Sequence, residues 1–287
     1  MSLTDIQIKN LETKANDIRI SILEMLVAAG SGHTAGPMGM ADIFAALYFH
    51  IANHDPKNPT WTNRDRIILS NGHIAPVRYA AMAHAGYFSV SELVTLRKFG
   101  SRLQGHPERH ALPGLENTSG PLGSGLSQAI GMALGLRIDA AKIDHPKPHV
   151  YCLMSDGELN EGNSWEAIMF AGKERLNNLT AIIDRNNIQI DGMTEDIMPL
   201  EPLADKWRAF NWHVIEIDGH NFNEIVDAVN QAKAIAEKPT VIIAHTVPGK
   251  GIPEIEGDYK WHGTPPNKEQ AEKWIDILKN NYASKNS

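Results

Sequence analysis

The second half of the sequence alternates short apolar runs with segments of helical periodicity, and this alternation strongly limits how the chain can fold. The apolar runs predict strands at residues 67–69, 150–154, 180–183, 213–217 and 240–244. Apolar residues at helical spacing predict helices at residues 3–29, 126–141, 165–176 and 222–236. Strands that alternate with helices are typical of parallel sheets. We therefore predict an α/β protein with a doubly wound, mostly parallel sheet and helices on both faces.

The composition is that of an ordinary globular protein. Of the 287 residues, 42% are hydrophobic and 21% are charged, which excludes collagen-like, coiled-coil and disordered chains. No repeat, low-complexity tract or linker divides the sequence, so we predict one domain over residues 1–287.

Charge and cysteine content exclude further classes. Lysine and arginine total 27 against 34 acidic residues, and no basic block is present, so a nucleic-acid partner is not expected. No apolar run approaches the roughly 18 residues of a membrane span, and the N-terminus lacks a secretory pattern. The single cysteine, Cys152, lies in an apolar run and fits a reducing compartment. We expect a cytoplasmic protein without a membrane partner.

Polar and glycine-rich segments follow four of the predicted strands. They are residues 70–73, 155–158, 184–187 and 218–221. Ligands of parallel α/β sheets bind beyond the carboxyl ends of the strands. We therefore expect these segments to converge at one edge of the sheet.

Asp156 and Asn186 are one strand–helix–strand crossover apart, so we expect them at neighbouring strand ends. Their oxygens suit Mg²⁺, which commonly completes its coordination with phosphate oxygens, and a diphosphate site is therefore our hypothesis. Gly157 would allow close backbone approach. Asn163 and Glu166 have the spacing of a capping box, and the helix that follows would favour an anion at its amino end. Ordinary turn and cap roles are the alternative.

Histidines are the second notable group. The chain has 13, and four lie beside glycine in predicted loops: His33, His73, His106 and His262. None of these four has the i, i+4 spacing of a helical zinc motif. Proton transfer or binding of substrate hydroxyls suits them better, with ordinary hydrogen bonding as the alternative.

A glycine-rich segment, residues 120–125, leads into a predicted helix that carries Ser127, Gly131 and Gly135 on one face. The segment matches neither the phosphate loop of nucleotide hydrolases nor the dinucleotide fingerprint. It is a candidate ligand loop, whereas the small residues of the helix also fit close packing against another helix.

Together these segments resemble the amino-terminal, thiamine-diphosphate-binding half of transketolase. The matching segments are residues 31–33, 69–73, 105–107, 120–123, 156–162, 186–192 and 262–263. Their order and approximate spacing agree with the family over nearly the whole chain. The resemblance implies the thiamine-diphosphate-binding fold, and within it the domain that binds the diphosphate.

The resemblance assigns metal and cofactor roles to individual residues. The Asp156 and Asn186 side chains and the Ile188 carbonyl would hold Mg²⁺, or Ca²⁺ or Mn²⁺ in its place, against the diphosphate of thiamine diphosphate. The residues implied to contact the diphosphate are Gly157, His73 and His262. The residues implied to lie against the cofactor rings are Leu122, Ile190 and Gly120.

The resemblance also implies catalytic roles. His33, His106 and His262 would bind ketose hydroxyls and assist proton transfers. Glu161 matches a buried glutamate that links paired active sites across the subunit interface. Two motifs depart from the family pattern: Ser155 replaces a glycine before Asp156, and Thr34-Ala35 follow His33 in place of a proline-glycine pair.

The implied reaction is transfer of a two-carbon ketol unit from a ketose phosphate to an aldose phosphate, as in the pentose phosphate pathway. A full transketolase is roughly twice as long, and its second half carries the pyrimidine-binding and carboxyl-terminal domains. We therefore expect a split enzyme with two copies of each chain, in which the pyrimidine domain belongs to a separate subunit. The alternatives are another sugar substrate, a 1-deoxyxylulose-5-phosphate synthase-like activity, or a non-catalytic cofactor-binding subunit.

Overall fold

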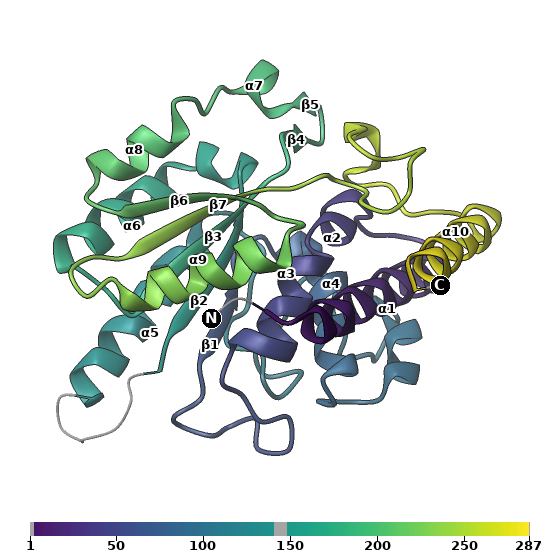
Figure 1. Cartoon of the computed structure of the whole chain (residues 1–287), viewed down its shortest axis with the longest axis horizontal. Helices are drawn as coiled ribbons and strands as arrows, with labels where there is room; N and C mark the ends of the chain where they lie inside the picture. The colour runs from purple at the N-terminus through teal and green to yellow at the C-terminus, as the bar shows by residue number, and fades with distance from the viewer. Residues whose placement is uncertain (1–2, 141–147, 287) are drawn as a thin grey trace.

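The computed structural model describes residues 3–140 and 148–286, with side chains to residue 282. Its centre is a five-stranded sheet in the order β1-β2-β3-β7-β6, and every pairing in it is parallel (Figure 1). The strands are β1 (Arg66–Leu69), β2 (Val150–Ser155), β3 (Leu179–Arg185), β6 (His213–Asp218) and β7 (Thr240–His245). All five predicted strands are confirmed, as is the α/β class. The sequence analysis missed a small antiparallel pair, β4 (Ile188–Gln189) and β5 (Gly192–Met193).

Helices surround the sheet (Figure 1). They are α1 (Asp5–Ala29), α2 (Ala35–Gly39), α3 (Ala41–Ala46), α4 (Ala75–His84), α5 (Ser124–Ala140), α6 (Gly162–Glu174), α7 (Thr194–Ile197), α8 (Leu203–Ala209), α9 (Phe222–Ala234) and α10 (Lys268–Asn286). Shorter helical turns are η1 (Leu47–Ile51), η2 (Gly72–Ile74), η3 (Val90–Thr95), η4 (Gly157–Asn160) and η5 (Tyr259–Trp261). The four predicted helices are confirmed within a few residues, except that the predicted end of one at Ala141 lies outside the described residues.

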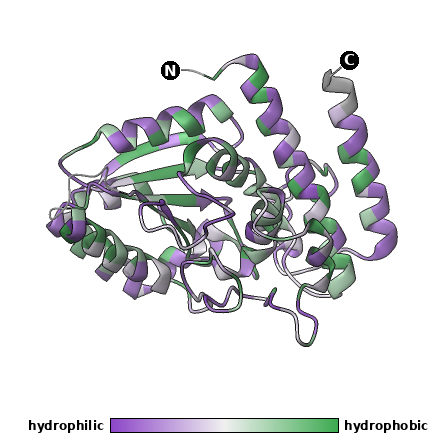
Figure 2. Ribbon diagram, turned by 90° about the horizontal axis from the view of Figure 1, so that it is seen from below, coloured by the Kyte–Doolittle hydropathy of each residue, from purple (hydrophilic) through white to green (hydrophobic). Residues whose placement is uncertain are grey.

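The alternation of side chains along each strand divides the core into two layers. In β2, Tyr151 and Leu153 pack with α1, α3 and α4, whereas Cys152 and Met154 face α5, α6 and α8 on the other side. Successive strand residues point to opposite faces, so a strand covered on both sides must be apolar throughout. Figure 2 shows the central strands as hydrophobic and the surrounding helices as mixed in hydropathy.

Local sequence signals set the ends of α1. Thr4 and Gln7 form a capping box, in which the Gln7 amide donates to Thr4 Oγ1 (3.3 Å) and the Thr4 amide donates to Gln7 Oε1 (2.9 Å). This box satisfies amide groups that have no partner inside the helix. At the other end Gly30 adopts a left-handed conformation (φ 64°), which glycine does without steric cost.

The face of α5 that carries Ser127, Gly131 and Gly135 points outward. A Cβ atom added at either glycine would have no neighbour within 4 Å, so this face packs against no helix of the described chain. Ile138, further along the same helix, is 52% exposed. Among the described residues, no helix is both long and apolar enough to span a bilayer.

Two helical glycines provide a matched test of the packing. A Cβ at Gly172 of α6 would lie 1.9 Å from the Phe210 carbonyl oxygen. We expect Gly172→Ala to lower the free energy of unfolding by about 2–3 kcal/mol, because backbone must move. The control, Gly131→Ala, should raise it by up to about 1 kcal/mol in the isolated chain. Urea denaturation measures both, and equal effects would contradict the packing described.

Candidate active site

The ends of β1, β2 and β3 open onto a cavity of about 440 Å³. The segments that follow these strands line it with His73, Ser155, Gly157, Glu158 and residues 188–191, which belong to the β4–β5 hairpin. The loops contribute His33, His106, Gly120, Leu122 and His262. The polar segments that follow β1, β2 and β3 therefore converge, as predicted.

The segment after β6 does not join this cavity. β6 is the edge strand, separated from β3 by β7. Its His220 instead contacts Asp42 (2.7 Å) and accepts a hydrogen bond from the Val247 amide (2.8 Å). All four polar segments follow the carboxyl ends of parallel strands and so lie at one edge of the sheet, as predicted, but strand order places this segment away from the cavity.

Three histidines from distant segments form a cluster in the cavity. The ring centroids of His33 and His73 are 5.0 Å apart, those of His73 and His262 are 5.2 Å apart, and those of His33 and His262 are 5.4 Å apart. The Nδ1 atoms of His33 and His262 are buried and have no hydrogen-bond partner in the described chain. Buried polar atoms without partners are rare and often indicate where a ligand binds.

The electrostatic environment keeps these rings neutral. Burial, followed by the nearby His262, Arg97 and His106, lowers the pKa of His33 to about 4. Burial also lowers the pKa of His73 well below its ordinary value, and it lowers the pKa of His262. At pH 7 each ring can therefore offer one nitrogen as donor and one as acceptor.

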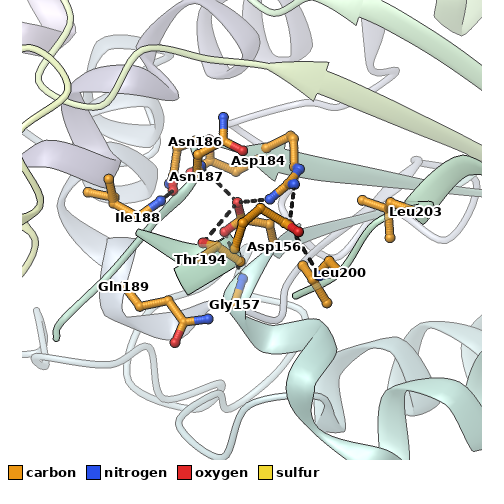
Figure 3. A network of polar contacts seen from close by, with 12 residues as sticks. Asp156, Gly157, Asp184, Asn186, Asn187, Ile188, Gln189, Thr194, Leu200 and Leu203 are labelled. Atoms are coloured by element: carbon orange, nitrogen blue, oxygen red, sulfur yellow. Dashed lines mark hydrogen bonds and ion pairs between the residues drawn. The ribbon is translucent and has the colours of Figure 1, made fainter. Parts of the chain in front are cut away.

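Asp156 lies at the centre of a buried polar network (Figure 3), and its neighbour Gly157 lines the cavity. Its Oδ2 accepts hydrogen bonds from Arg185 Nη1 (3.0 Å) and the Asn187 amide (2.8 Å). Its Oδ1 accepts from the Gly157 amide (2.7 Å). Burial raises the pKa of Asp156, and these hydrogen bonds and Arg185 oppose that rise. Each carboxylate oxygen accepts about two hydrogen bonds, so Oδ1 retains capacity for a cation.

Asn186 directly follows β3 and Asp156 directly follows the neighbouring strand β2, as predicted. β2 and β3 pair so that Ser155 is opposite Asp184, which places the residues after both strands side by side. Asn186 Oδ1 accepts from the Ile188 amide (3.0 Å), and its Nδ2 donates to Asp184 Oδ2 (2.8 Å). The amide oxygen of Asn186 and a carboxylate oxygen of Asp156 are the hard donors that Mg²⁺ prefers.

Two buried carboxyl groups of the site were not assigned from the sequence. Asp184 is held by Asn186 and the Thr246 hydroxyl, and burial raises its pKa to about 7. Glu158 accepts from the Ser70 hydroxyl, the Gly123 amide (2.6 Å) and the Ser155 amide (3.2 Å). Burial also raises the pKa of Glu158 to about 7. Acidic residues after a strand are usually solvated, so sequence alone gives no signal that these two are buried.

The structure corrects the predicted capping box. α6 begins at Gly162 after Glu161, with no side-chain cap, and Asn163 Nδ2 instead contacts the Leu122 carbonyl oxygen (3.4 Å). The turn η4 intervenes between β2 and α6, so the amino end of α6 does not line the cavity. Asn163 lies against Gly123, where a Cβ would come 1.9 Å from its Oδ1.

The remaining predicted residues fall into two groups. Gly120, Leu122 and Ile190 line the cavity, and Ile190 is 66% exposed. Glu161 is exposed and lies outside the cavity lining. His106 is exposed and lines the cavity, beside the three clustered rings.

Comparison with known families identifies the fold and its ligand class. The family model described as "Transketolase, thiamine diphosphate binding domain" matches residues 11–284. The chain belongs to the transketolase family. The transketolase of Campylobacter jejuni has a crystal structure that matches with a TM-score of 0.90 and 38% identity, covering 98% of this chain and 43% of that one.

Two relatives of similar length are transketolase subunits. The 6-deoxy-6-sulfo-D-fructose transketolase subunit of Clostridium sp. is 47% identical over 253 residues, 88% of this chain and 90% of that protein. An apulose-4-phosphate transketolase subunit of Phocaeicola vulgatus is 39% identical over 269 residues, 94% of each chain. This member of the transketolase family is accordingly a transferase subunit.

The site fits the diphosphate cofactor of transketolases in its donor chemistry. Asp156 and Asn186 supply oxygen ligands for a divalent cation. The Nδ1 atoms of His33 and His262 have no hydrogen-bond partner in the described chain, and partly exposed apolar side chains complete the cavity. Among the described residues, no three His, Cys, Asp or Glu residues gather as a metal site, which is expected where the ligands are one carboxylate, one amide and one carbonyl.

The lowered histidine pKa predicts a pH effect on stability. On acidification from pH 7 to 5 the unfolded chain protonates His33, at its ordinary pKa of 6.5, whereas the folded chain does not. Stability therefore falls as pH falls. We expect His33→Gln to reduce the loss in unfolding free energy over this interval by about 2 kcal/mol. Urea denaturation at both pH values tests this.

The matched control for this test is His110→Gln, an exposed histidine outside the cavity. An equal change in pH dependence for both variants would contradict the neutral assignment of His33.

Proposed function

We propose that this chain is the amino-terminal subunit of a split transketolase, which transfers a two-carbon ketol unit between sugars together with a pyrimidine-domain subunit. The observation that carries the proposal is that Asp156 and Asn186 hydrogen-bond to the Gly157 and Ile188 amides, and that Gly157 and Ile188 line the same cavity as the histidine cluster. Similarity over about nine-tenths of two transketolase subunits supports the split arrangement.

Asp156 Oδ1, Asn186 Oδ1 and the Ile188 carbonyl would hold Mg²⁺, with Ca²⁺ or Mn²⁺ as substitutes. Gly157, His73 and His262 would contact the diphosphate. Arg185 Nη1, at 3.0 Å, and the Asn187 amide, at 2.8 Å, fix the Asp156 carboxylate in one orientation before any cation binds. A preorganised ligand loses less conformational entropy on binding.

The chemistry supplied by bound thiamine diphosphate is a nucleophilic carbon that breaks and forms carbon–carbon bonds. The residues of this chain would bind and polarise the sugar next to the cofactor. His33, His106 and His262 would hydrogen-bond the hydroxyls of the sugar, and their neutral rings can both donate and accept protons. Leu122 and Ile190 offer apolar surface for the thiazolium ring, and Gly120 leaves room for the aminopyrimidine.

Glu161 and the outer face of α5 would contact other subunits in an assembly of two chains of each kind. Glu161, Gly131 and Gly135 are all exposed in the isolated chain. Apolar helices with small outward residues allow close approach of a partner. The sugars named for the two subunit relatives carry a sulfonate or a phosphate. We therefore propose that the substrate of this chain is an anionic sugar, and we assign no pathway.

Reconstitution tests the split. The chain saturated with thiamine diphosphate and Mg²⁺ should transfer no ketol unit from xylulose 5-phosphate to ribose 5-phosphate by itself. Addition of a pyrimidine-domain transketolase subunit should restore transfer, because that subunit would supply the other half of the site and cover Ile190, which lines the cavity and is 66% exposed. A coupled assay of aldose release measures this, and robust turnover by the chain alone would refute the proposal.

The metal assignment has its own test. Asp156→Ala should abolish Mg²⁺-dependent binding of thiamine diphosphate in the reconstituted complex, measured by calorimetry, because the only charged cation ligand is lost. The control is Asp205→Ala, which removes an exposed carboxylate that pairs with Arg208 (2.8 Å) and does not line the cavity. Unchanged affinity in Asp156→Ala would remove the metal assignment.

A further inference from the structure

A second cavity, of about 320 Å³, lies beyond the carboxyl ends of β6 and β7. The polar segment that follows β6 contributes His220 to its wall, and the segment that follows β7 contributes Lys250 and Gly251. Helices α1 and α10, which pack against each other (Figure 1), also line it. None of the described residues lines both this cavity and the histidine cavity. We call it the Arg19 cavity, after an α1 residue on its wall.

Arg19, Asp42 and His220 form a largely buried charge network on this wall. Arg19 Nη1 and Nη2 donate to the two carboxylate oxygens of Asp42 (3.1 and 2.6 Å). His220 Nε2 accepts from the Val247 amide (2.8 Å), so the ring proton lies on Nδ1 and is donated to Asp42 (2.7 Å). Burial acts to raise the pKa of Asp42, but Arg19 and His220 outweigh it and lower that pKa. The carboxylate is therefore ionised, and both its oxygens are occupied.

Hydrogen-bond donors are left over once this network is complete. A guanidinium has five N–H groups. Those of Arg19 make two hydrogen bonds to Asp42 and one, from Nε, to the Met38 carbonyl oxygen (3.1 Å). The other N–H groups have no acceptor in the described chain. Lys250 is half-buried, and its side chain makes no ion pair or hydrogen bond with any residue that the structure describes.

Gly251 brings the segment of Lys250 close to Arg19. Its φ is 98°, a left-handed value that side chains other than glycine rarely adopt. A Cβ added there would lie 2.8 Å from Leu278 Cδ2 and 3.6 Å from Arg19 Cδ. The backbone next to Lys250 therefore packs on the Arg19 side chain, and two cationic side chains line one cavity although only one of them is paired with a carboxylate.

The unused donors determine which ligand chemistry fits. Donors without acceptors favour a ligand whose oxygens accept hydrogen bonds and carry negative charge. Asp42 does not supply this charge, because Arg19 already balances it. Glu12 also lines the cavity and opposes an anion at its own position. The polar Asn16 and the apolar Phe222 and Leu278 complete the wall, a mixture that suits an organic molecule better than a bare ion.

We propose that the Arg19 cavity binds a small organic oxyanion, a carboxylate or a phosphate ester, through Lys250 and the unused N–H groups of Arg19. Its position agrees with the general rule that ligands of parallel α/β sheets bind beyond the carboxyl ends of the strands. Because this cavity is separate from the histidine cavity, the proposal is independent of the transketolase function proposed above.

The binding test titrates the full chain, without Mg²⁺ or thiamine diphosphate, with inorganic phosphate and separately with acetate at constant ionic strength. NMR follows the amide signal of Gly251, while that of Gly157 reports binding in the histidine cavity. We expect saturable shifts of Gly251 with a Kd of about 1–10 mM. Shifts with phosphate alone would indicate a phosphate ester, with acetate alone a carboxylate, and with both an oxyanion of either kind. No saturable shift of Gly251 with either anion would overturn the proposal.

Three variants make the test specific. Lys250→Met removes the unpaired charge but keeps an unbranched side chain, and should weaken binding by about tenfold or more. Glu12→Gln removes the negative charge from the wall and should tighten binding by about twofold or more. The control is Lys268→Met, which removes an exposed lysine charge outside the cavity and should change the Kd by less than about twofold. Equal effects of Lys250→Met and Lys268→Met would show a response to overall charge and would contradict a site at Lys250.

Discussion

The site depends on one buried carboxyl group, that of Glu158. It joins three segments that are far apart in the sequence: the end of β1 through Ser70, the glycine loop through Gly123, and the end of β2 through Ser155. Ser70 in turn accepts from the Gly125 amide (3.1 Å). An acceptor with two oxygens can satisfy several donors at once, which a neutral apolar side chain cannot. Because Glu158 connects these segments, the spacing of the loops around the cavity is fixed by the chain itself.

The cavity next to Glu158 separates two kinds of electrostatic environment. On one side, behind the cavity lining, the Asp156 carboxylate pairs with Arg185, and the Asp184 carboxyl group, whose pKa burial raises to about 7, is held by Asn186 and Thr246. On the other side, burial keeps His33 and His73 neutral, and the positive charge of Arg97 adds to this effect at His33. A cation is therefore favoured at the strand ends, and uncharged hydrogen-bonding groups are favoured where sugar hydroxyls would lie.

Much of this arrangement could be predicted from the sequence, and the limits have physical causes. The strands, the helices and the adjacency of Asp156 and Asn186 follow from periodicity and crossover length, which are local properties. The separation of His220 from the site could not be predicted, because it depends on strand order. Glu158 was missed for a related reason: its role comes from burial, which only the packed chain defines. Likewise the supposed cap at Asn163 serves the glycine loop instead.

The position of Cys152 has a practical consequence. Its side chain lies in the core layer under α5 and α6 with no exposed surface, and burial raises its thiol pKa well above the usual range. The reactive thiolate is thus scarce, and a reagent can reach the sulfur only when the sheet itself opens. As the chain has no other cysteine, the rate of alkylation measures how often the central strands separate, without any engineered label.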